Sequence, residues 1–357
     1  MTIESAVQQV VEPAVVVVAG VDTHQRTHHV VVLDERGSRV GDRQVDNSSD
    51  GYRQLLDFVA GRGLIVRVGV ESTGSYGAGL TRFLREAGVE VVEVNRPARQ
   101  SRAIAGKSDP IDAESAARQV LSGVATAVPK DTTGQVEAIR VLKVARDAAV
   151  KAKTAALGQI RDLILTAPAE LRASVDAPTA RARVKACLGL RPDPTRAGDP
   201  AQAAKIALRS LARRVRDLET EIAELDAALT PLVARVAPTL VGLRQVGTHT
   251  AAQLLVTAGQ NPDRLRSEAA FARLTGTAPL PASSGKTRRM RLSRGGDRQA
   301  NRALHIIAVG RLRTDERSRQ YAARRTAEGL SKKDIIRCLK RYAAREIFTA
   351  IRTDLAP

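Results

Sequence analysis

The chain has 357 residues, of which 43% are hydrophobic, and it carries a net charge of +19 at pH 7. This composition is typical of a globular protein and excludes a chain that is disordered throughout. No apolar run approaches the roughly 20 residues of a membrane-spanning helix, and the first residues lack the basic group of a signal peptide. We therefore expect a cytoplasmic protein with no membrane partner.

The positive charge is concentrated in the last third of the chain. Residues 231–357 contain 25 Lys and Arg against 9 Asp and Glu, whereas the preceding residues contain 32 against 29. Charge concentrated in this way indicates a polyanion partner, and Arg, which binds phosphate bidentately, dominates it. The chain has no Trp and only 4 Phe and 4 Tyr, so stacking of bases on aromatic rings is not the expected binding mode.

The first part of the chain alternates between strand and helix patterns. Apolar, β-rich runs at 15–22, 28–34, 40–45, 64–71 and 89–95 predict strands. Helical spacing at 52–59 and 77–87 predicts helices between the later strands. Adjacent strands followed by alternating helices and strands indicate a mixed sheet with helices on its faces.

From about Asp112 onward the pattern is helical, and one segment repeats apolar residues in steps of four and three. Its members are Leu211, Val215, Leu218, Ile222, Leu225, Leu229 and Leu232. This spacing predicts a coiled coil that joins protomers, with a helical hairpin inside one chain as the alternative. The Pro-rich stretch 191–200 is expected to lead into this helix, and Pro231 and Pro238 are expected to frame its exit.

Residues 243–259 place a Gly in a turn between two apolar helical segments. This pattern predicts either a helix-hairpin-helix element, whose turn amides hold a backbone phosphate, or an ordinary helical turn.

Four acidic residues stand at element ends. Asp22 and Glu71 each close a predicted strand, and Asp109 and Asp112 share one face of a predicted helix start. If the two strands are neighbours, the carboxylates meet at one sheet edge and can hold Mg²⁺, with Mn²⁺ as a substitute. The structural alternative makes Asp109 a helix N-cap and Asp112 a partner of the helix dipole. Three histidines lie nearby: His24, His28 and His29. Their spacing does not suit a set of metal ligands on one face.

A second candidate site lies in residues 274–302. Ser283, Ser284 and Gly285 form a small-residue turn, and a basic series follows it: Lys286, Arg288, Arg289, Arg291, Arg294, Arg298 and Arg302. A serine on such a turn beside clustered cations is suited to attack a phosphodiester. A Ser-Gly loop that only binds phosphate is the alternative.

These segments resemble a known family. Asp22 in GVDTH, Glu71 in VESTGSYG and the pair Asp109 and Asp112 in KSDPIDA resemble the DEDD motif of the IS110 family of insertion-sequence transposases, which includes bridge-RNA-guided recombinases and related invertases. The later PLPASSG and RLSRGGDRQANRALH segments look like the C-terminal transposase domain of that family. The resemblance runs from about Ala19 to Ala350. The chain departs from it at RQVGTHT and TGTAP, where the family commonly has Pro-Gly and Gly-Leu-x-Pro.

The resemblance implies a fold and a division of the chain. It implies an α/β, RNase H-like (RuvC-like) N-terminal domain at 14–130, a helical coiled-coil region at 131–235 and a mainly α C-terminal transposase domain at 236–357. Residues 1–13 lie outside it and are expected to be a disordered leader.

The resemblance also implies a chemistry. The four acids would hold Mg²⁺, Ser284 would be the nucleophile, with Ser283 as the other candidate, and a structured guide RNA would pair with donor and target DNA. Because the two motifs lie on different domains, we expect the complete site to form in a homo-oligomer, a dimer or a tetramer joined through the coiled coil.

The sequence therefore predicts a transposase or site-specific recombinase that breaks and rejoins DNA. One alternative is a RuvC-like junction nuclease that uses water. A second is a non-catalytic nucleic-acid-binding protein. A third is a sugar kinase of the actin-like fold, which would leave the basic C-terminal part unexplained.

Overall fold

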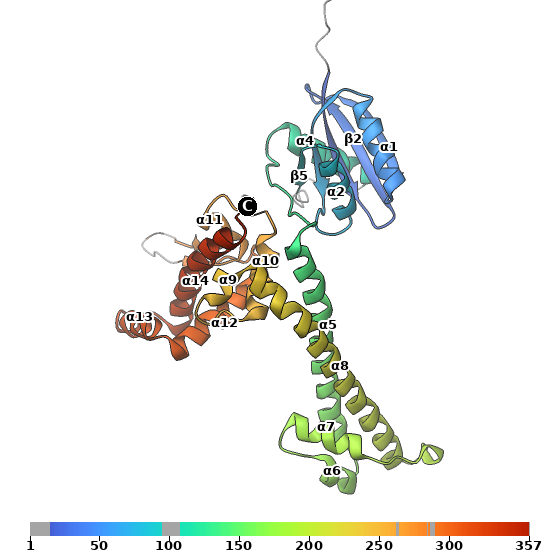
Figure 1. The fold of residues 1–357 in the computed structure, drawn as a ribbon, viewed down its shortest axis with the longest axis vertical. Helices are drawn as coiled ribbons and strands as arrows, with labels where there is room; N and C mark the ends of the chain where they lie inside the picture. Colours follow the sequence, from blue (N-terminus) through green and yellow to red (C-terminus); the bar gives the residue numbers. More distant parts are fainter. Residues whose placement is uncertain (1–14, 95–107, 262–263, 284, 286–289, 357) are drawn as a thin grey trace, which may run out of the picture. The chain divides into compact units, whose positions relative to one another are not determined.

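The computed structural model describes residues 15–94, 108–261, 264–283, 285 and 290–356 (Figure 1). The chain divides into two compact units, residues 1–133 and 134–357. Across the described ranges, no helix combines the length and the apolar character required to cross a membrane.

The described part of the first unit is built on a five-stranded mixed sheet. Its strands are β1 (Val16–Thr23), β2 (Thr27–Asp34), β3 (Arg39–Asp46), β4 (Leu64–Glu71) and β5 (Val91–Val94), in the order β3-β2-β1-β4-β5. Neighbours in β1–β2–β3 are antiparallel, whereas β4 runs parallel to β1 and β5 parallel to β4. The predicted mixed sheet is confirmed, and its order is consistent with an RNase H-like domain.

Helices cover both faces of this sheet. Helices α1 (Ser49–Ala60) and α2 (Ala78–Glu86) bury Leu55, Val59, Leu80 and Leu84 on one face, against alternate valines of the strands. Helix α4 (Asp109–Leu121) packs Ala113, Ala116, Ala117 and Val120 on the other face. Because side chains alternate along a strand, β1, β2 and β5 contribute to both cores, whereas the buried apolar side chains of β3 and β4 lie on the α1–α2 face.

Gly20 allows α4 to lie directly on β1. A Cβ atom at this position would stand 2.1 Å from the Ala117 amide nitrogen and 2.2 Å from the Ala113 carbonyl oxygen. On β4, a Cβ at Gly69 would stand 2.5 Å from a Val120 methyl carbon. Glycine at both positions therefore sets how closely the helix approaches the sheet.

The second unit is mostly helical. It contains α5 (Gln135–Thr166), α6 (Ala169–Val175), α7 (Ala180–Gly189), the 3₁₀ turn η1 (Pro194–Arg196), α8 (Pro200–Val236), α9 (Pro238–Gly242), α10 (Thr248–Ala258), α11 (Glu268–Leu274), α12 (Arg298–Thr314), α13 (Glu316–Ala327) and α14 (Lys332–Asp354). Two short antiparallel strands, β6 (Pro279–Pro281) and β7 (Met290–Leu292), form a hairpin between α11 and α12.

Helices α5 and α8 form an antiparallel pair within one chain (Figure 1). The start of α5 shares a core with the end of α8, through Ile139 and Val233, and the end of α5 shares another with the start of α8, through Ile160 and Leu208. The Arg146 guanidinium on α5 lies 2.8 Å from the Asp226 carboxylate on α8. The chain thus forms the helical hairpin that the sequence left open.

The heptad residues divide into two sets in this hairpin. Val215, Ile222 and Leu229 are buried inside the chain, whereas Leu211, Leu218, Leu225 and Leu232 are half-buried. Contact between protomers along this seam stays a prediction.

Pro231 and Pro238 frame the exit of α8, as the sequence predicts, because the helix ends between them at Val236. The helix continues through Pro231 to Val236, and Pro238 opens α9. An internal Pro costs a helix about 3 kcal/mol. Val233 and Val236 beyond it are buried in the core shared with α10 and α12, and burying each contributes about 1.5–3 kcal/mol, which offsets this cost.

Candidate functional site

Asp22 and Glu71 lie side by side at one edge of the sheet. The last paired residues of the parallel strands β1 and β4 are Val21 and Val70, so the two acids occupy the next position on each strand. Gly20 and Gly69, two residues earlier, both face α4, and strand alternation turns both carboxylates toward that same face. Both residues are buried, with 6% and 8% of their surfaces exposed.

Helix α4 brings Asp109 to this edge. Its N-cap is Ser108, whose carbonyl accepts from the Asp112 amide at 3.0 Å, and Asp109 is the first helical residue. The structural alternative that made Asp109 the N-cap is therefore wrong, because the chain turns into the helix one residue earlier. The Asp109 side chain is 47% exposed, and Asp112 lies half-buried three residues later in the first turn.

His24 completes a cluster with two of the acids. Its Nδ1 lies 3.6 Å from Asp22 Oδ2, and its Nε2 lies 4.0 Å from Asp109 Oδ1. The candidate ligand atoms of Asp22, His24 and Asp109 all lie within 4.8 Å of one another. Sequence reasoning missed this role because it weighed the three histidines as one set. The useful signal was the position of His24 two residues after a strand-ending acid.

The other two histidines have separate surroundings. His28 is fully buried and stacks on the Tyr52 ring, with ring centroids 5.8 Å apart. The Nε2 of His29 lies 2.8 Å from the Asp42 carboxylate. Neither belongs to the three-residue cluster, which agrees with the expectation that the histidines do not form one ligand face.

Burial raises the pKa of Asp22 to about 6, and His24 opposes this shift. The neighbouring carboxyls of Glu71 and Asp109 raise the pKa further, and Glu71 shares a hydrogen bond with Asp22. Carboxylates crowded in this way repel one another when ionised, and a bound cation relieves the repulsion. The oxygen donors of Asp22, Glu71 and Asp109 therefore fit Mg²⁺, and the His24 imidazole adds a ligand type that suits Mn²⁺ better.

The turn after β4 holds the backbone of Glu71 in place. The Thr23 hydroxyl donates to the Glu71 carbonyl at 2.9 Å, tying the ends of β1 and β4 together. Ser72 has a φ of 55°, which is unusual for a residue with a side chain. A Cβ at Gly77 would stand 2.8 Å from the Glu71 carbonyl oxygen, so the turn closes tightly over this residue. Backbone strain of this kind is typical of functional sites.

The predicted serine segment connects the two strands of the β6–β7 hairpin. Leu280 pairs with Arg291 and Pro281 with Met290, and the predicted serine segment lies between these pairs in the sequence. Ser283 is exposed and Gly285 has a φ of +54°. Ser284 lies outside the described residues, as do Lys286, Arg288 and Arg289.

Four predicted phosphate-binding arginines are placed by the structure: Arg291, Arg294, Arg298 and Arg302. All four are exposed, and within the described ranges no ion pair engages any of them. Exposed guanidinium groups without a carboxylate partner remain available to phosphate.

The base of the hairpin is fixed by residues that sequence reasoning assigned no role. A Cβ at Gly296 would stand 2.2 Å from the Gly276 amide nitrogen, so the two glycines pack backbone to backbone. The Asn301 amide donates to the Thr275 and Gly276 carbonyls at 2.9 and 3.0 Å. Asp297 caps α12 and accepts from the Thr257 hydroxyl at 2.7 Å. The signal was present in the GGDRQAN run, where Asp precedes a helix.

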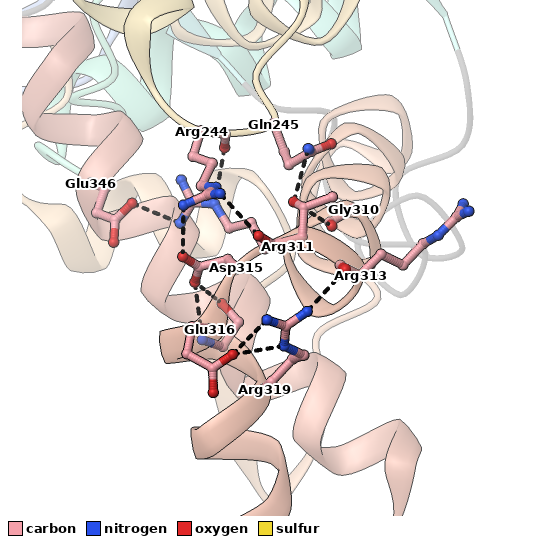
Figure 2. A network of polar contacts seen from close by, with 11 residues as sticks. Arg244, Gln245, Gly310, Arg311, Arg313, Asp315, Glu316, Arg319 and Glu346 are labelled. Atoms are coloured by element: carbon pink, nitrogen blue, oxygen red, sulfur yellow. Dashed lines mark hydrogen bonds and ion pairs between the residues drawn. The ribbon is translucent and has the colours of Figure 1, made fainter.

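The turn between α9 and α10 is held from the end of α12, as Figure 2 shows. Arg244 donates to the Thr314 carbonyl at 2.9 Å, and Gln245, with a φ of 64°, donates to the Thr314 hydroxyl at 3.0 Å. Arg311 donates to the Arg244 carbonyl at 3.1 Å. Of the two helical segments predicted within 243–259, only α10 is present, because residues 243–247 form the turn and α9 ends at Gly242. The polar side chains of the turn contact α12.

Comparisons with known proteins agree with this arrangement. Residues 19–167, which contain all four predicted acids, match the sequence model of the IS110 DEDD transposase domain. Residues 239–323, which contain the β6–β7 hairpin, match the model described as transposase IS116/IS110/IS902 family. The two models cover separate parts of the chain in the order that the sequence predicted.

Curated relatives come from insertion elements. The chain is 26% identical to a 43.6 kDa protein of insertion element IS110 from Streptomyces coelicolor, over 93% of each chain. It is 28% identical to a 42 kDa protein of insertion element IS900 from Mycobacterium paratuberculosis, over 42% of this chain and 39% of the relative.

A mixed sheet that gathers carboxylates at one edge, followed by a mostly helical region, is consistent with the class of DEDD transposases, whose catalytic domain is RNase H-like. Within that class, the chain belongs to the IS110 family, enzymes that cut and transfer DNA.

Proposed function

We propose that this transposase breaks and rejoins DNA with two chemical groups: a divalent-metal site at Asp22, Glu71, Asp109 and Asp112, and a nucleophilic serine, Ser284. The observation that carries the proposal is the meeting of Asp22, Glu71 and Asp109 at one sheet edge, with two of the three provided by neighbouring strands. Acids placed only for helix capping or solubility would not leave the carboxyls of Asp22 and Glu71 buried beside each other.

The acids would hold Mg²⁺, with Mn²⁺ as a substitute. Asp22 and Glu71 offer buried oxygen donors, Asp109 and Asp112 offer donors from the first turn of α4, and His24 lies beside Asp22. A bound divalent cation polarises a phosphodiester oxygen and offsets the negative charge that develops on it. The close packing of α4 on Gly20 keeps Asp109 in register with the sheet edge.

The serine would act through a covalent intermediate. Ser284 Oγ bonds to phosphorus, the bond from phosphorus to one strand end breaks, and that end leaves as a hydroxyl, taking up a proton as the serine hydroxyl loses its own. The phosphoserine ester conserves the energy of the broken phosphodiester bond. The hydroxyl of a second strand can therefore attack the phosphorus, join to it and release the serine hydroxyl. The exposed Arg291 on β7 and Arg294 just after this strand support binding of the phosphate that reacts.

The DNA and RNA partners follow from the charge and the family. DNA is the substrate of a transposase, and the exposed basic series after the hairpin suits its backbone. A structured guide RNA that pairs with donor and target DNA is proposed on the family resemblance. A homo-oligomer, dimer or tetramer, is proposed on the half-buried leucines of α8, Leu218 and Leu225.

Cleavage of a labelled donor DNA by purified variants tests the proposal. We expect Ser284→Ala to lose strand cleavage while its matched control, Ser283→Ala, retains it. Glu71→Gln should lose cleavage while keeping DNA affinity. Full cleavage by Ser284→Ala would instead identify a nuclease that uses water, and full cleavage by Glu71→Gln would remove the metal site.

A further inference from the structure

The second unit contains a cavity between the β6–β7 hairpin and helix α14. Its volume is about 610 Å³, and it is lined from the hairpin side by Thr277, Pro279 and Arg291 and from α14 by Arg337, Lys340 and Arg341. A space of this size accommodates a small ligand or one nucleotide of a chain.

The described lining residues are strongly cationic, with Arg291, Arg325, Arg337, Lys340, Arg341 and Arg345 against Asp334 alone. Several of these arginines have acidic partners. Arg337 pairs with Asp334 at 2.8 Å, Arg345 pairs with Glu268 at 3.0 Å, and Arg341 also contacts Glu268. Arg325 also contacts Glu328, and Arg341 and Arg345 share the one carboxylate of Glu268. Within the described residues, Lys340 and Arg291 are the lining cations that no ion pair engages.

Lys340 is the unusual member of this set. It is only 6% exposed, and its ammonium donates to the Asn301 amide oxygen at 2.5 Å. In the described part of the chain, no carboxylate lies within ion-pairing distance of it. Burial lowers the pKa of this ammonium, and the nearby Arg337 adds to the effect. A buried cation with only a neutral partner lacks a counter-charge that an anion in the cavity would supply.

We propose that this cavity binds a phosphate of the DNA backbone, with Lys340 as its buried counter-charge. The assignment to DNA rests on the proposed function, because the cavity is walled by the hairpin that carries Ser284. Asn301 links the two features: its oxygen accepts from Lys340, and its amide group holds the Thr275 and Gly276 carbonyls at the base of the hairpin. A phosphate bound here therefore fixes the position of the DNA relative to the hairpin.

Fluorescence anisotropy on duplex DNA over a range of salt concentrations tests this assignment. Lys340→Met removes the buried charge, and Lys333→Met, on the exposed start of the same helix, removes an equal charge outside the cavity. We expect Lys340→Met to weaken binding about tenfold and to reduce the slope of log affinity against log salt by about 0.9, as loss of one phosphate contact does. An effect no larger than that of Lys333→Met would overturn the proposal.

A second measurement uses the unaltered protein and so does not depend on a variant that folds. Cys338 lines the cavity and is partly exposed, whereas Cys187 is fully buried. We expect duplex DNA to slow the alkylation of Cys338 by iodoacetamide at least fivefold, read by peptide mass spectrometry. Equal alkylation rates with and without DNA would contradict the proposal. Equal protection by inorganic phosphate, or stronger protection by duplex RNA, would also contradict it and would assign the cavity to a free anion or to RNA.

Both measurements are made in EDTA, where no cleavage occurs. If Ser284→Ala retains cleavage but Lys340→Met weakens binding, the serine mechanism fails and the phosphate cavity stands. If Ser284→Ala abolishes cleavage but Lys340→Met binds DNA as Lys333→Met does, the serine mechanism stands and the phosphate cavity fails.

Discussion

Asp22 and Glu71 share a hydrogen bond at the carboxyl ends of two neighbouring parallel strands, one position beyond the paired Val21 and Val70. Placing two buried carboxyls in contact is unfavourable for folding unless a proton or a cation lies between them. We therefore expect the stability of the first unit to depend on both pH and divalent metal.

The pH dependence of stability should reveal this pair. The pKa of Asp22 is raised to about 6 in the folded state, so between about pH 4 and 6 the folded state binds more protons than the unfolded state, and stability falls as the pH rises. Without metal at pH 7.5, Asp22→Asn should be more stable than the parent by about 2 kcal/mol, and this advantage should vanish below pH 4. Thermal unfolding at both pH values, with and without Mg²⁺, measures it; Mg²⁺ should stabilise only the parent. If the difference in stability between the parent and Asp22→Asn were the same at both pH values, the pKa of Asp22 would not be raised.

His24 should influence which metal binds. Its imidazole lies beside Asp22 and Asp109, and nitrogen ligands suit Mn²⁺ better than Mg²⁺. We expect His24→Asn to weaken Mn²⁺ binding about tenfold and Mg²⁺ binding less than threefold, measured by titration calorimetry. His29→Asn, whose histidine contacts Asp42 instead, serves as the control. Equal losses for both metals would show that His24 acts only through the position of Asp22.

Gly20 should be intolerant of any side chain. A Cβ there would overlap the backbone of α4 at Ala113 and Ala117, and relief requires the helix to move away from the sheet. We expect Gly20→Ala to lower the free energy of unfolding by about 3 kcal/mol and to weaken Mg²⁺ binding, because Asp109 moves with α4. Gly158→Ala, in the middle of α5 with no atom near its Cβ position, should stabilise the protein by up to about 1 kcal/mol. Unchanged metal affinity in Gly20→Ala would separate helix placement from the metal site.

The half-buried leucines of α8 offer a test of oligomer formation. Leu218→Glu and Leu225→Glu should dissociate the oligomer in light scattering and abolish recombination while DNA binding persists. Ile222→Glu should instead lower the melting temperature, because Ile222 is buried inside the α5–α8 hairpin. An oligomer of unchanged mass in both leucine variants would mean that the heptad residues of α8 pack only within the α5–α8 hairpin.

The strands and the positions of Asp22 and Glu71 were predictable from the sequence. An apolar run predicts a buried strand, and an acidic residue that follows the run marks where the strand ends. His24 was missed because the three neighbouring histidines were weighed as one set, and its approach to Asp109 also depends on where α4 begins. The sequence alternative named Asp109 as the N-cap, whereas the structure has Ser108. Both residue types are good caps, and sequence patterns do not locate a helix start to within one residue.

Other features depend on tertiary contacts. Pro231 and Pro238 bracketed the end of α8 but did not give its last residue, because the buried valines beyond Pro231 carry the helix through to Val236. The seam of α8 could not be assigned from sequence to one chain or two, since α5 lacks an equally regular heptad pattern. Lys340 gave no signal because one more Lys in a basic segment looks like a solvated residue until its burial is known.

The most direct test of the account is mass spectrometry of a protein–DNA adduct trapped on a donor DNA nicked near the cleavage site. We expect a nucleotide linked through phosphate to the peptide that contains Ser284, formed with Mg²⁺ and absent from Asp22→Asn. Cleaved DNA with free ends, and no nucleotide on any serine, would contradict it.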